Sequence, residues 1–329
     1  MDQKDISEQF KILTKKTGLP LKKIADFFYY LQMHKKLENN ELVGMVGVAR
    51  NVLNEIKKTC YFWFNTSSST TSLSGEGFLM MQGSFSDQYI PEEKILTIFS
   101  DSQFLLFKSL LEKKRLPRLG SNRNLDQFLA TTETITRRAV IMDFFEDLEG
   151  KRILFLGDDD FTSVALSLIR KADSIRVLEI DERIVGNIEK VSKEGNPTIR
   201  VERYDAREVL PKEYQDQFDV IFTDPPYTPA GVKLFLSRAI QALDKTNKSA
   251  RIYLCFGSSD AAKERLLPIQ EILVNSGLML RWAFDKFNRY ESGAEAIGNA
   301  SSLYILDITP KAKPPISGSF KEPIYTHLK

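Results

Sequence analysis

Acidic residues follow four apolar segments in the second half of the chain, and they are the side chains best suited to chemistry. They occur in Gly157-Asp158-Asp159-Asp160, Glu179-Ile180-Asp181, Asp205-Ala206 and Asp224-Pro225-Pro226-Tyr227. Because the carboxyl ends of parallel strands meet at one edge of a sheet, we expect these acids to line a common crevice. Carboxylates there can bind hydroxyl or ammonium groups, or take up a proton.

The loop after the first of these segments contains a single glycine, Gly157, followed by three aspartates. Loops that bind a pyrophosphate normally carry several glycines, which let the backbone approach the phosphates. Three carboxylates would repel a pyrophosphate by roughly 1 kcal/mol per charge pair in water, and by more when partly buried. The loop therefore disfavours NAD, FAD and ATP as ligands.

The acids after the second and third segments are spaced for an adenosine. Glu179 and Asp181 follow Gly157 by about 20 residues, the spacing at which an acid reaches ribose hydroxyls. Asp205 and Ala206 would then lie where an adenine amino group is bound. A site that accepts an adenosine but repels a pyrophosphate suggests S-adenosylmethionine or a relative. The alternative is that each acid only caps the following helix, but four strand ends in register argue against it.

Asp224-Pro225-Pro226-Tyr227 is the most specific motif. Its two prolines fix the backbone and remove two amide donors, so Asp224 and Tyr227 would project into the crevice. Enzymes that methylate an exocyclic base nitrogen use this arrangement, which indicates attack of a nitrogen on a sulfonium carbon. The aspartate trio would repel the carboxylate of S-adenosylmethionine. It would attract the ammonium group of decarboxylated S-adenosylmethionine and of a polyamine acceptor.

Three functions are compatible with these residues. Aminopropyl transfer to a polyamine is favoured by the acidic crevice. An S-adenosylmethionine-dependent nitrogen methyltransferase acting on nucleic acid or a small amine is the alternative enzyme. A transcriptional regulator whose degenerate catalytic domain senses a polyamine is the non-enzymatic alternative, which the intact carboxylates at all four strand ends disfavour.

Apolar runs that alternate with amphipathic helices predict the fold that positions these acids. Strands are expected at 152–156, 175–180, 199–203, 218–223, 250–256, 278–284 and 302–308, with helices at 162–171 and 183–191 between the first three. Strands separated by helices form right-handed crossovers and a mainly parallel sheet. The sequence therefore predicts an α/β, Rossmann-like, methyltransferase-type catalytic domain over residues 133–310.

Residues 1–111 are predicted to form a small helical domain. It contains three amphipathic stretches and an aromatic segment, at 6–13, 24–31, 43–56 and 61–64. This pattern is typical of a helix-turn-helix or winged-helix unit, which binds DNA through its third helix or serves in dimerisation and packing. The third stretch has no dense basic face, so we favour dimerisation or packing. The polar tract 66–77 is expected to be a loop.

The composition excludes several classes of function. The 329 residues carry 46 Lys and Arg against 44 Asp and Glu, and this balance disfavours nucleic acid and acidic membranes as partners. No apolar run reaches the about 18 residues that span a bilayer, and the polar start MDQKDISEQF predicts neither a signal nor a transit peptide. Two cysteines and two histidines leave little scope for a disulfide framework or a metal site. We expect a cytoplasmic protein without a metal.

Together the motifs resemble the branched-chain polyamine synthases, which are N(4)-bis(aminopropyl)spermidine synthases. The resemblance rests on the Gly157 and Asp224 motifs and on Asp126-Gln127 followed by Thr131, Thr134 and Arg137. It implies a winged-helix-like domain before a Rossmann-like catalytic domain, in a homodimer. It also implies sequential transfer of aminopropyl groups from decarboxylated S-adenosylmethionine to the secondary amine of spermidine, giving N4-aminopropylspermidine and then N4-bis(aminopropyl)spermidine. No cofactor is implied beyond this donor.

The resemblance implies roles for individual residues as well. Asp159 would be the base or orient the attacking amine, with Asp224 as the second catalytic acid. The substrate-binding residues would be Asp158, Asp160, Tyr227, Gln127 and Asp126, of which Tyr227 would pack on a methylene stem. The donor-binding residues would be Gly157, Glu179, Asp181, Asp205 and Ala206. Asp126 could equally cap a helix, and the preferred polyamine and the number of transfers stay open.

Three further segments complete the predicted organisation. Residues 112–132 are expected to be a linker that contributes to the substrate side. The stretch 287–299 could be a flap carrying Tyr290 or Glu295, although a β-hairpin loop is favoured. The tail, 311–329, is rich in proline and lysine; it could close as a lid, but a disordered terminus is favoured.

Overall fold

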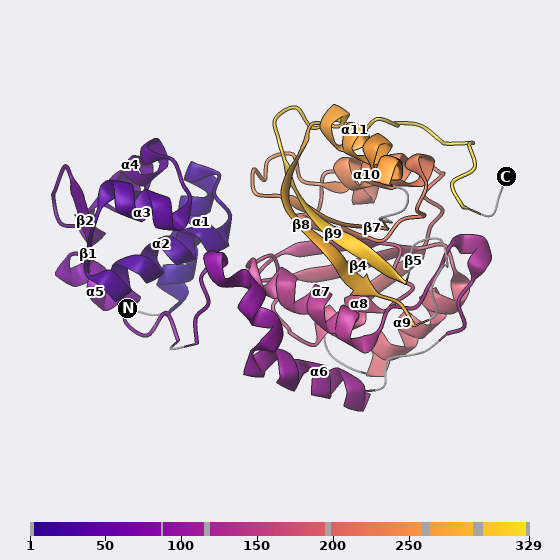
Figure 1. The fold of residues 1–329 in the computed structure, drawn as a ribbon, viewed down its shortest axis with the longest axis horizontal. Helices are drawn as coiled ribbons and strands as arrows, with labels where there is room; N and C mark the ends of the chain where they lie inside the picture. The colour runs from indigo at the N-terminus through magenta and orange to yellow at the C-terminus, as the bar shows by residue number, and fades with distance from the viewer. Residues whose placement is uncertain are drawn as a thin grey trace. The chain divides into compact units, whose positions relative to one another are not determined.

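The chain folds into two compact units, shown in Figure 1 as a computed structural model. The structure describes residues 3–86, 88–114, 119–194, 199–257, 263–291 and 299–326. Unit 1 comprises the residues up to Ser100 together with Phe144–Glu146, and unit 2 comprises Asp101–Asp143 and the residues from Asp147 onward. The division falls before α6 (Ser102–Lys114), so the boundary predicted at residue 111 lies inside a helix.

Unit 1 is, in its described part, a helical domain with a small two-stranded sheet. Its helices are α1 (Gln3–Thr17), α2 (Leu21–His34), α3 (Asn39–Val46), α4 (Arg50–Thr59) and α5 (Gly75–Met81), with the 3-10 segments η1 (Tyr61–Trp63) and η2 (Glu92–Ser100). Strands β1 (Lys36–Glu38) and β2 (Thr70–Ser72) pair antiparallel. The core is aromatic at its centre, where Phe28 stacks on Phe10 and Phe64.

Two segments of unit 1 differ from their predictions. The amphipathic stretch 43–56 is divided at Gly47, whose φ of 70° ends α3 before α4 begins. Glycine is the usual residue at such a left-handed helix end, because it has no Cβ. The polar tract 66–77 is only partly a loop, since it contains β2 and the start of α5. Its strand forms because β1, from a distant part of the chain, supplies the pairing partner.

Unit 2 is built, within its described residues, on a seven-stranded sheet. The strands are β3 (Arg152–Leu156), β4 (Ser174–Glu179), β5 (Ile199–Arg203), β6 (Val220–Thr223), β7 (Arg251–Phe256), β8 (Leu278–Arg289) and β9 (Ala300–Ile308). Their order is β5-β4-β3-β6-β7-β9-β8, and β9 runs antiparallel to both of its neighbours while the other adjacent pairs are parallel. The prediction of a mainly parallel, Rossmann-like sheet is therefore confirmed.

Helices cover both faces of this sheet. The described helices of unit 2 are, besides α6, α7 (Thr132–Phe144), α8 (Thr162–Ser167), α9 (Glu182–Glu194), α10 (Pro229–Ala242) and α11 (Leu267–Asn275), with the 3-10 segments η3 (Arg123–Leu125), η4 (Lys212–Tyr214) and η5 (Lys263–Leu266). In Figure 1, α7, α8 and α9 lie on one side of the sheet, and α10 and α11 on the other. Every residue of β6 and β7 is buried as a consequence.

The strand order creates a switch point beside β3. From β3 the chain continues outward to β4 and β5, and it then returns to β6 on the other side of β3. The loops after β3 and β6 therefore diverge, and open α/β sheets bind their ligands at such a point. The four acidic motifs of the sequence follow β3, β4, β5 and β6, so the topology brings them to one edge.

The C-terminal tail packs on unit 2 as far as it is described, to Thr326. The Thr228 hydroxyl at the start of α10 donates a hydrogen bond to the carbonyl of Ile324, at 2.7 Å. Ile324 and Tyr325 are only 1% and 7% exposed. The favoured prediction of a disordered terminus is therefore wrong for this part of the tail, because the domain offers its apolar side chains a place to be buried.

Candidate functional site

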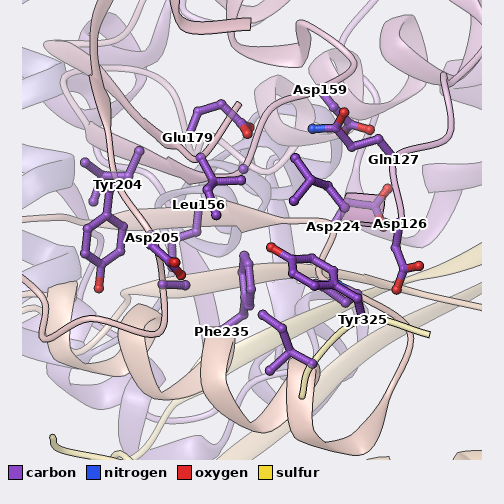
Figure 2. A pocket seen from close by; sticks show the side chains of 17 residues that line it. Asp126, Gln127, Leu156, Asp159, Glu179, Tyr204, Asp205, Asp224, Phe235 and Tyr325 are labelled. Carbon is purple, nitrogen blue, oxygen red and sulfur yellow. The ribbon is translucent and has the colours of Figure 1, made fainter. Parts of the chain in front are cut away.

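A pocket lies at the carboxyl ends of β3, β4, β5 and β6, and Figure 2 shows the side chains around it. It is lined by Leu125, Asp126, Gln127, Leu156, Gly157, Asp159, Leu178, Glu179, Ile180, Tyr204, Asp205, Ala206, Asp224, Pro226, Phe235, Ile324 and Tyr325. Eight of the predicted site residues are among these. The other four, Asp158, Asp160, Asp181 and Tyr227, do not line the pocket.

The three consecutive aspartates after β3 have three different surroundings. Asp158 turns inward and accepts hydrogen bonds from the amide and the hydroxyl of Ser163 in α8. Asp160 also turns inward and pairs with Arg138, with 2.8 Å between Oδ2 and Nη1. Asp159 faces the pocket, and within the described part of the chain its carboxylate makes no hydrogen bond or ion pair. The structure thus differs from the expectation that all three face the substrate, since protein donors occupy the oxygens of Asp158 and Asp160.

The backbone conformation at Gly157 and a neighbouring acid, Glu179, fix the loop from which these three side chains point in different directions. Gly157 has a φ of 76°, a left-handed conformation that would strain any other residue. Glu179, at the end of β4, holds the loop from the side. Its Oε2 accepts a hydrogen bond from the Asp158 amide and its Oε1 accepts one from the Asp181 amide, each at 2.8 Å. Glu179 therefore shapes the loop while also lining the pocket.

The pKa values of the trio follow these surroundings. Burial raises the pKa of Asp159 well above its usual range, and the nearby charges of Asp160, Asp224 and Glu179 raise it further, while Arg138 opposes the rise. Burial also raises the pKa of Asp160, but only to about 6, because the Arg138 guanidinium stabilises its charged form. Asp159 therefore combines access to the pocket with a proton affinity suited to a general base.

Asp224, which follows β6, is oriented by three donors. Arg138 Nη2 donates to its Oδ2 at 2.7 Å, and the Tyr290 hydroxyl donates to the same oxygen at 2.9 Å. The Tyr227 hydroxyl donates to Oδ1 at 2.8 Å. Burial raises the pKa of both tyrosines, so their hydroxyls stay protonated as donors. Tyr227 packs on Phe256 behind the pocket wall, whereas the sequence placed it against a substrate stem.

Arg138 and Asn288 complete this cluster, and the sequence analysis missed both. Arg138 is 1% exposed, and its Nε donates to Asn288 Oδ1 at 2.8 Å. The sequence motif instead contained the adjacent Arg137, whose Nη2 pairs with Glu133 at 2.9 Å. The helical period could have found Arg138, because it follows Thr134 by four residues and thus shares its helix face. Asn288 has no comparable signal in the sequence.

The segment predicted as a flap contributes to the same cluster. Tyr290 follows β8 directly, and its hydroxyl also lies 2.8 Å from the hydroxyl of Ser301 in β9. β8 and β9 pair antiparallel, as the hairpin interpretation predicted. Tyr290 is therefore part of the folded hairpin, and Glu295 lies outside the described residues.

Two aspartates on the donor side share one local arrangement. Asp181 accepts hydrogen bonds from the amide and guanidinium of Arg183, and Asp205 accepts the same bonds from Arg207. The bonds from Arg183 lower the pKa of Asp181, and those from Arg207 lower the pKa of Asp205 despite its burial. Each of these two carboxylates thus forms an ion pair with the arginine two residues further along the chain. Because Arg183 lies in the first turn of α9, the helix-capping alternative holds for Asp181.

The wall opposite the strand ends comes from the segment before α7 and from the tail. Asp126 accepts hydrogen bonds from the amide and the hydroxyl of Thr326, at 2.7 and 2.6 Å. Its carboxylate therefore ties down the tail instead of capping a helix. Tyr325 reaches across the pocket beside it, and Gln127 lies nearer to Asp159 (Figure 2). The tail thus closes one side of the site.

Among the described residues, no group of three or more His, Cys, Asp or Glu side chains is arranged to hold a metal ion. In the same ranges, no helix has both the length and the apolar character needed to cross a bilayer. Cys60 and Cys255 are both free thiols and both buried.

Comparison with known proteins relates the chain to one family. Residues 109–317 match the family model of the branched-chain polyamine synthase A C-terminal domain. An uncharacterized protein of Methanocaldococcus jannaschii is 43% identical over 202 residues, which are 60% of this chain and 50% of that protein. The N(4)-bis(aminopropyl)spermidine synthase of Thermococcus kodakarensis is 35% identical over 167 residues, 50% of this chain and 47% of that enzyme. The matches therefore span about half the length of these relatives.

A solved structure supports the fold across the whole chain. The branched-chain polyamine synthase of Thermus thermophilus, in complex with N4-aminopropylspermidine and 5'-methylthioadenosine, superposes with a TM-score of 0.59. The comparison covers 99% of this chain and 98% of that one, at 20% sequence identity. At this identity the likeness establishes the common fold.

Proposed function

The chain belongs to the branched-chain polyamine synthase family, and on this basis we propose that it is an aminopropyltransferase. It transfers aminopropyl groups from decarboxylated S-adenosylmethionine to the secondary amine of spermidine and releases methylthioadenosine. The first transfer gives N4-aminopropylspermidine, and the second gives N4-bis(aminopropyl)spermidine.

The observation that carries the proposal is the carboxylate of Asp159, which faces an acid-lined pocket and has no hydrogen-bond or ion-pair partner among the described residues. A polyamine nitrogen resembles a lysine amine, with an unperturbed pKa near about 10, so it arrives protonated and must lose that proton before it can attack. Asp159, with its raised pKa, is the acceptor for it. Asp224 at the strand ends and Asp126 on the opposite wall both line the pocket, where their carboxylates can bind the flanking ammonium groups.

The transfer is a displacement at carbon. The lone pair of the acceptor nitrogen forms a bond to the propyl carbon attached to sulfur. The carbon–sulfur bond breaks, its electron pair stays on sulfur, and the sulfonium becomes the neutral thioether of methylthioadenosine. The proton of the acceptor nitrogen passes to Asp159. By holding the flanking ammonium groups, the acidic wall would keep nitrogen and carbon in line, which is the main source of rate in a two-substrate reaction.

The donor occupies the side of the pocket formed by β4 and β5. Glu179 would bind the ribose hydroxyls, and Asp205 with Ala206 would bind the adenine, as all three line the wall. The Gly157 loop leaves room for the sulfonium and its aminopropyl chain. The carboxylate of intact S-adenosylmethionine would face Asp159 there and be repelled, whereas the ammonium of the decarboxylated donor would be attracted.

The proposal also covers the roles of the other predicted residues. Asp158 and Asp160 act by shaping the loop that presents Asp159, because their oxygens accept hydrogen bonds from Ser163 and Arg138. Asp181 acts on the donor through the Glu179 carboxylate that its amide holds. Gln127 lies on the wall, where its amide can bind the donor or the acceptor.

Unit 1 is part of the proposal as a winged-helix module for homodimerisation. Its order of helix α2, strand β1, helices α3 and α4, and strand β2 supports this interpretation, as does the antiparallel bridge between Phe64 and Leu73. The near-neutral charge of the chain argues against nucleic acid as its ligand. A cytoplasmic location is supported by two thiols that stay free.

Mass spectrometry of the reaction products tests the proposed activity. The full chain is incubated with spermidine and either decarboxylated or intact S-adenosylmethionine. We expect one or two aminopropyl groups on spermidine with the decarboxylated donor alone, together with methylthioadenosine. Methylation of the amine with the intact donor would instead show a nitrogen methyltransferase, and binding of spermidine without any product would show a sensor.

Two variants make this test specific to the pocket. Asp159→Asn keeps the shape of the side chain but removes the base, so we expect product formation to fall by about 10²- to 10⁴-fold. Asp143→Asn is the matched control, since Asp143 pairs with Lys171 at the surface. Equal rates in the two variants would remove Asp159 from the catalytic role.

A further inference from the structure

We infer that Arg138 is a positioning residue for the transfer: it holds the carboxylates of Asp160 and Asp224 in fixed positions, so that proton uptake falls to Asp159. This inference rests on the proposed aminopropyl transfer. It goes beyond that proposal because it assigns a role to a buried arginine that does not line the pocket.

The geometry of Arg138 is that of a clamp between two strand ends. Its Nη1 donates to Asp160 Oδ2 at 2.8 Å and its Nη2 donates to Asp224 Oδ2 at 2.7 Å. Asp160 lies in the loop after β3 and Asp224 follows β6, and these two strands are neighbours in the sheet. The clamp therefore bridges the two sides of the switch point at which the pocket lies.

The guanidinium is itself held in place on its remaining sides. Its Nε donates to Asn288 Oδ1 at 2.8 Å, and the amide of Asn288 donates to Ser301 Oγ at 2.9 Å. Its Cζ lies 5.2 Å from the centre of the Phe222 ring, within the range of a cation–π contact. A guanidinium has a rigid planar fork of donors, so these contacts set the directions of both carboxylates as well as their charge.

Charge balance explains why the clamp matters for Asp159. Two carboxylates on neighbouring strand ends without a cation would repel each other, and one of them would take up a proton. Here each accepts charge-assisted hydrogen bonds, and Asp224 accepts two more from Tyr227 and Tyr290. The oxygens of both carboxylates are thereby held by protein donors. Asp159, which no such donor reaches among the described residues, is left as the member of the group that exchanges a proton.

The charged and titratable groups around Asp159 define the direction of the effect. They are Asp158 and Asp160 in the same loop, Glu179 at β4, Asp205 after β5, Asp224 and Tyr227 after β6, Tyr290 after β8, Asp126 and Tyr325 on the opposite wall, and Arg138 in α7. Asp160, Asp224 and Glu179 raise the pKa of Asp159, and Arg138 lowers it. Weakening the electrostatic effect of Arg138 must therefore raise the pKa of Asp159. The fraction of Asp159 that is deprotonated and available as a base at a given pH then falls.

The experiment compares the pH profiles of kcat/KM for the wild type and for Arg138→Lys. Lysine keeps the positive charge but, as a point donor, cannot hold both carboxylates in the same geometry. An opposite charge within about 4–6 Å moves a carboxyl pKa by 1–3 units. Lysine keeps that charge and changes only its position, so we expect the acidic limb to move up by less, about half a unit. At a pH on that limb this is a loss of about threefold, which disappears at high pH. A uniform loss at every pH would overturn the inference.

Arg152→Lys is the matched control. Arg152 also bridges two aspartates, Asp219 at 3.0 Å and Asp244 at 2.8 Å, but it lies at the start of β3, at the opposite end of the strand from the pocket. We expect its replacement to leave the acidic limb unmoved. The same shift in both variants would show a general effect of lost ion pairs and would refute a specific role for Arg138.

A second variant and a second readout keep the test independent of folding and of activity. Asn288→Ala removes one hydrogen-bond partner of Arg138 without removing the charge of the arginine. We expect a smaller upward shift of the acidic limb of the kcat/KM profile in this variant. If Arg138→Lys does not fold, the absence of a shift in Asn288→Ala would overturn the inference. Without turnover, the pH dependence of the stability gain from Asp159→Asn reports the pKa of Asp159. We expect this dependence to extend to higher pH when Arg138 is lysine. If the wild type forms no product and the Arg138→Lys background still shows this extension, the proposed activity alone is refuted. If the pH dependence is the same with arginine and with lysine at position 138, the role of Arg138 is refuted.

Discussion

Replacing Asp159 by asparagine is expected to make the protein more stable while making it less active. Asp159 is a partly buried carboxyl that receives no hydrogen bond from any described residue, and its pKa in the folded protein lies above the usual range. In the unfolded chain the pKa returns to about 3.9. At neutral pH, unfolding therefore frees this carboxyl from an environment that disfavours its charge, and asparagine carries no such penalty.

The sign and size of the effect follow from linkage. Below about pH 4 the carboxyl is protonated in both states, so its charge contributes nothing to the stability difference. As the pH rises above about 3.9, the unfolded state loses the proton first, and the folded state loses stability until the pH passes the raised pKa of Asp159. Each pKa unit of difference costs about 1.4 kcal/mol. One such step corresponds to about 3–6 °C in Tm for a domain of this size.

The assay is thermal unfolding of the full chain from pH 4.5 to pH 8, with enzyme rates measured in parallel. We expect the Tm of Asp159→Asn to exceed that of the wild type by about 3 °C or more at pH 8 and by less at pH 4.5. Asp181→Asn is the control of opposite sign. Arg183 lowers the pKa of Asp181, so removing the Asp181 charge should lower Tm by a nearly constant amount from pH 4.5 to pH 8. A lower Tm for Asp159→Asn at pH 8, or a gain independent of pH, would refute the reasoning.

Two further predictions concern the walls of the pocket. Gly231→Ala would place a Cβ 2.7 Å from the carbonyl oxygen of Pro226, which must shift, so we expect lower product formation and a lower Tm. Gly186→Ala is the control, because its Cβ meets open space and should change neither product formation nor Tm. Equal effects of the two variants would contradict this prediction. Tyr325→Ala removes a buried side chain that lines the pocket, so we expect a higher KM for the donor. Tyr61→Ala, at a side chain that is 74% exposed, should leave this KM unchanged. An unaltered KM in Tyr325→Ala would exclude the tail from donor binding.

The sheet of unit 2 was predictable because burial on both faces leaves a simple pattern. β3 and β5 begin and end at the predicted residues, 152–156 and 199–203. β8 extends beyond its predicted end at 284 to Arg289, since this part of the strand is irregular and pairs with β9 across a register shift. A period-based prediction does not follow a strand through such an irregularity.

Unit 1 and the tail were less predictable, since their structure depends on partners far away in the chain. The tract 66–77 has the composition of a loop, but part of it becomes β2 by pairing with β1. The tail has the composition of a mobile end, but Ile324 and Tyr325 are buried on unit 2. Composition reports what a segment can do alone, and in both cases a tertiary contact decides otherwise.

The acidic character of the site is a local property, whereas the role of each acid is not. Carboxylates at four strand ends are visible in the sequence, and a parallel sheet must gather them at one edge. Asp158, Asp159 and Asp160 are chemically identical and consecutive, so no local pattern can rank them. Ser163 engages the first and Arg138 the third, which leaves Asp159 facing the pocket. Hydrogen bonds act over only about 3 Å, and folding alone brings donors from separate segments within that distance.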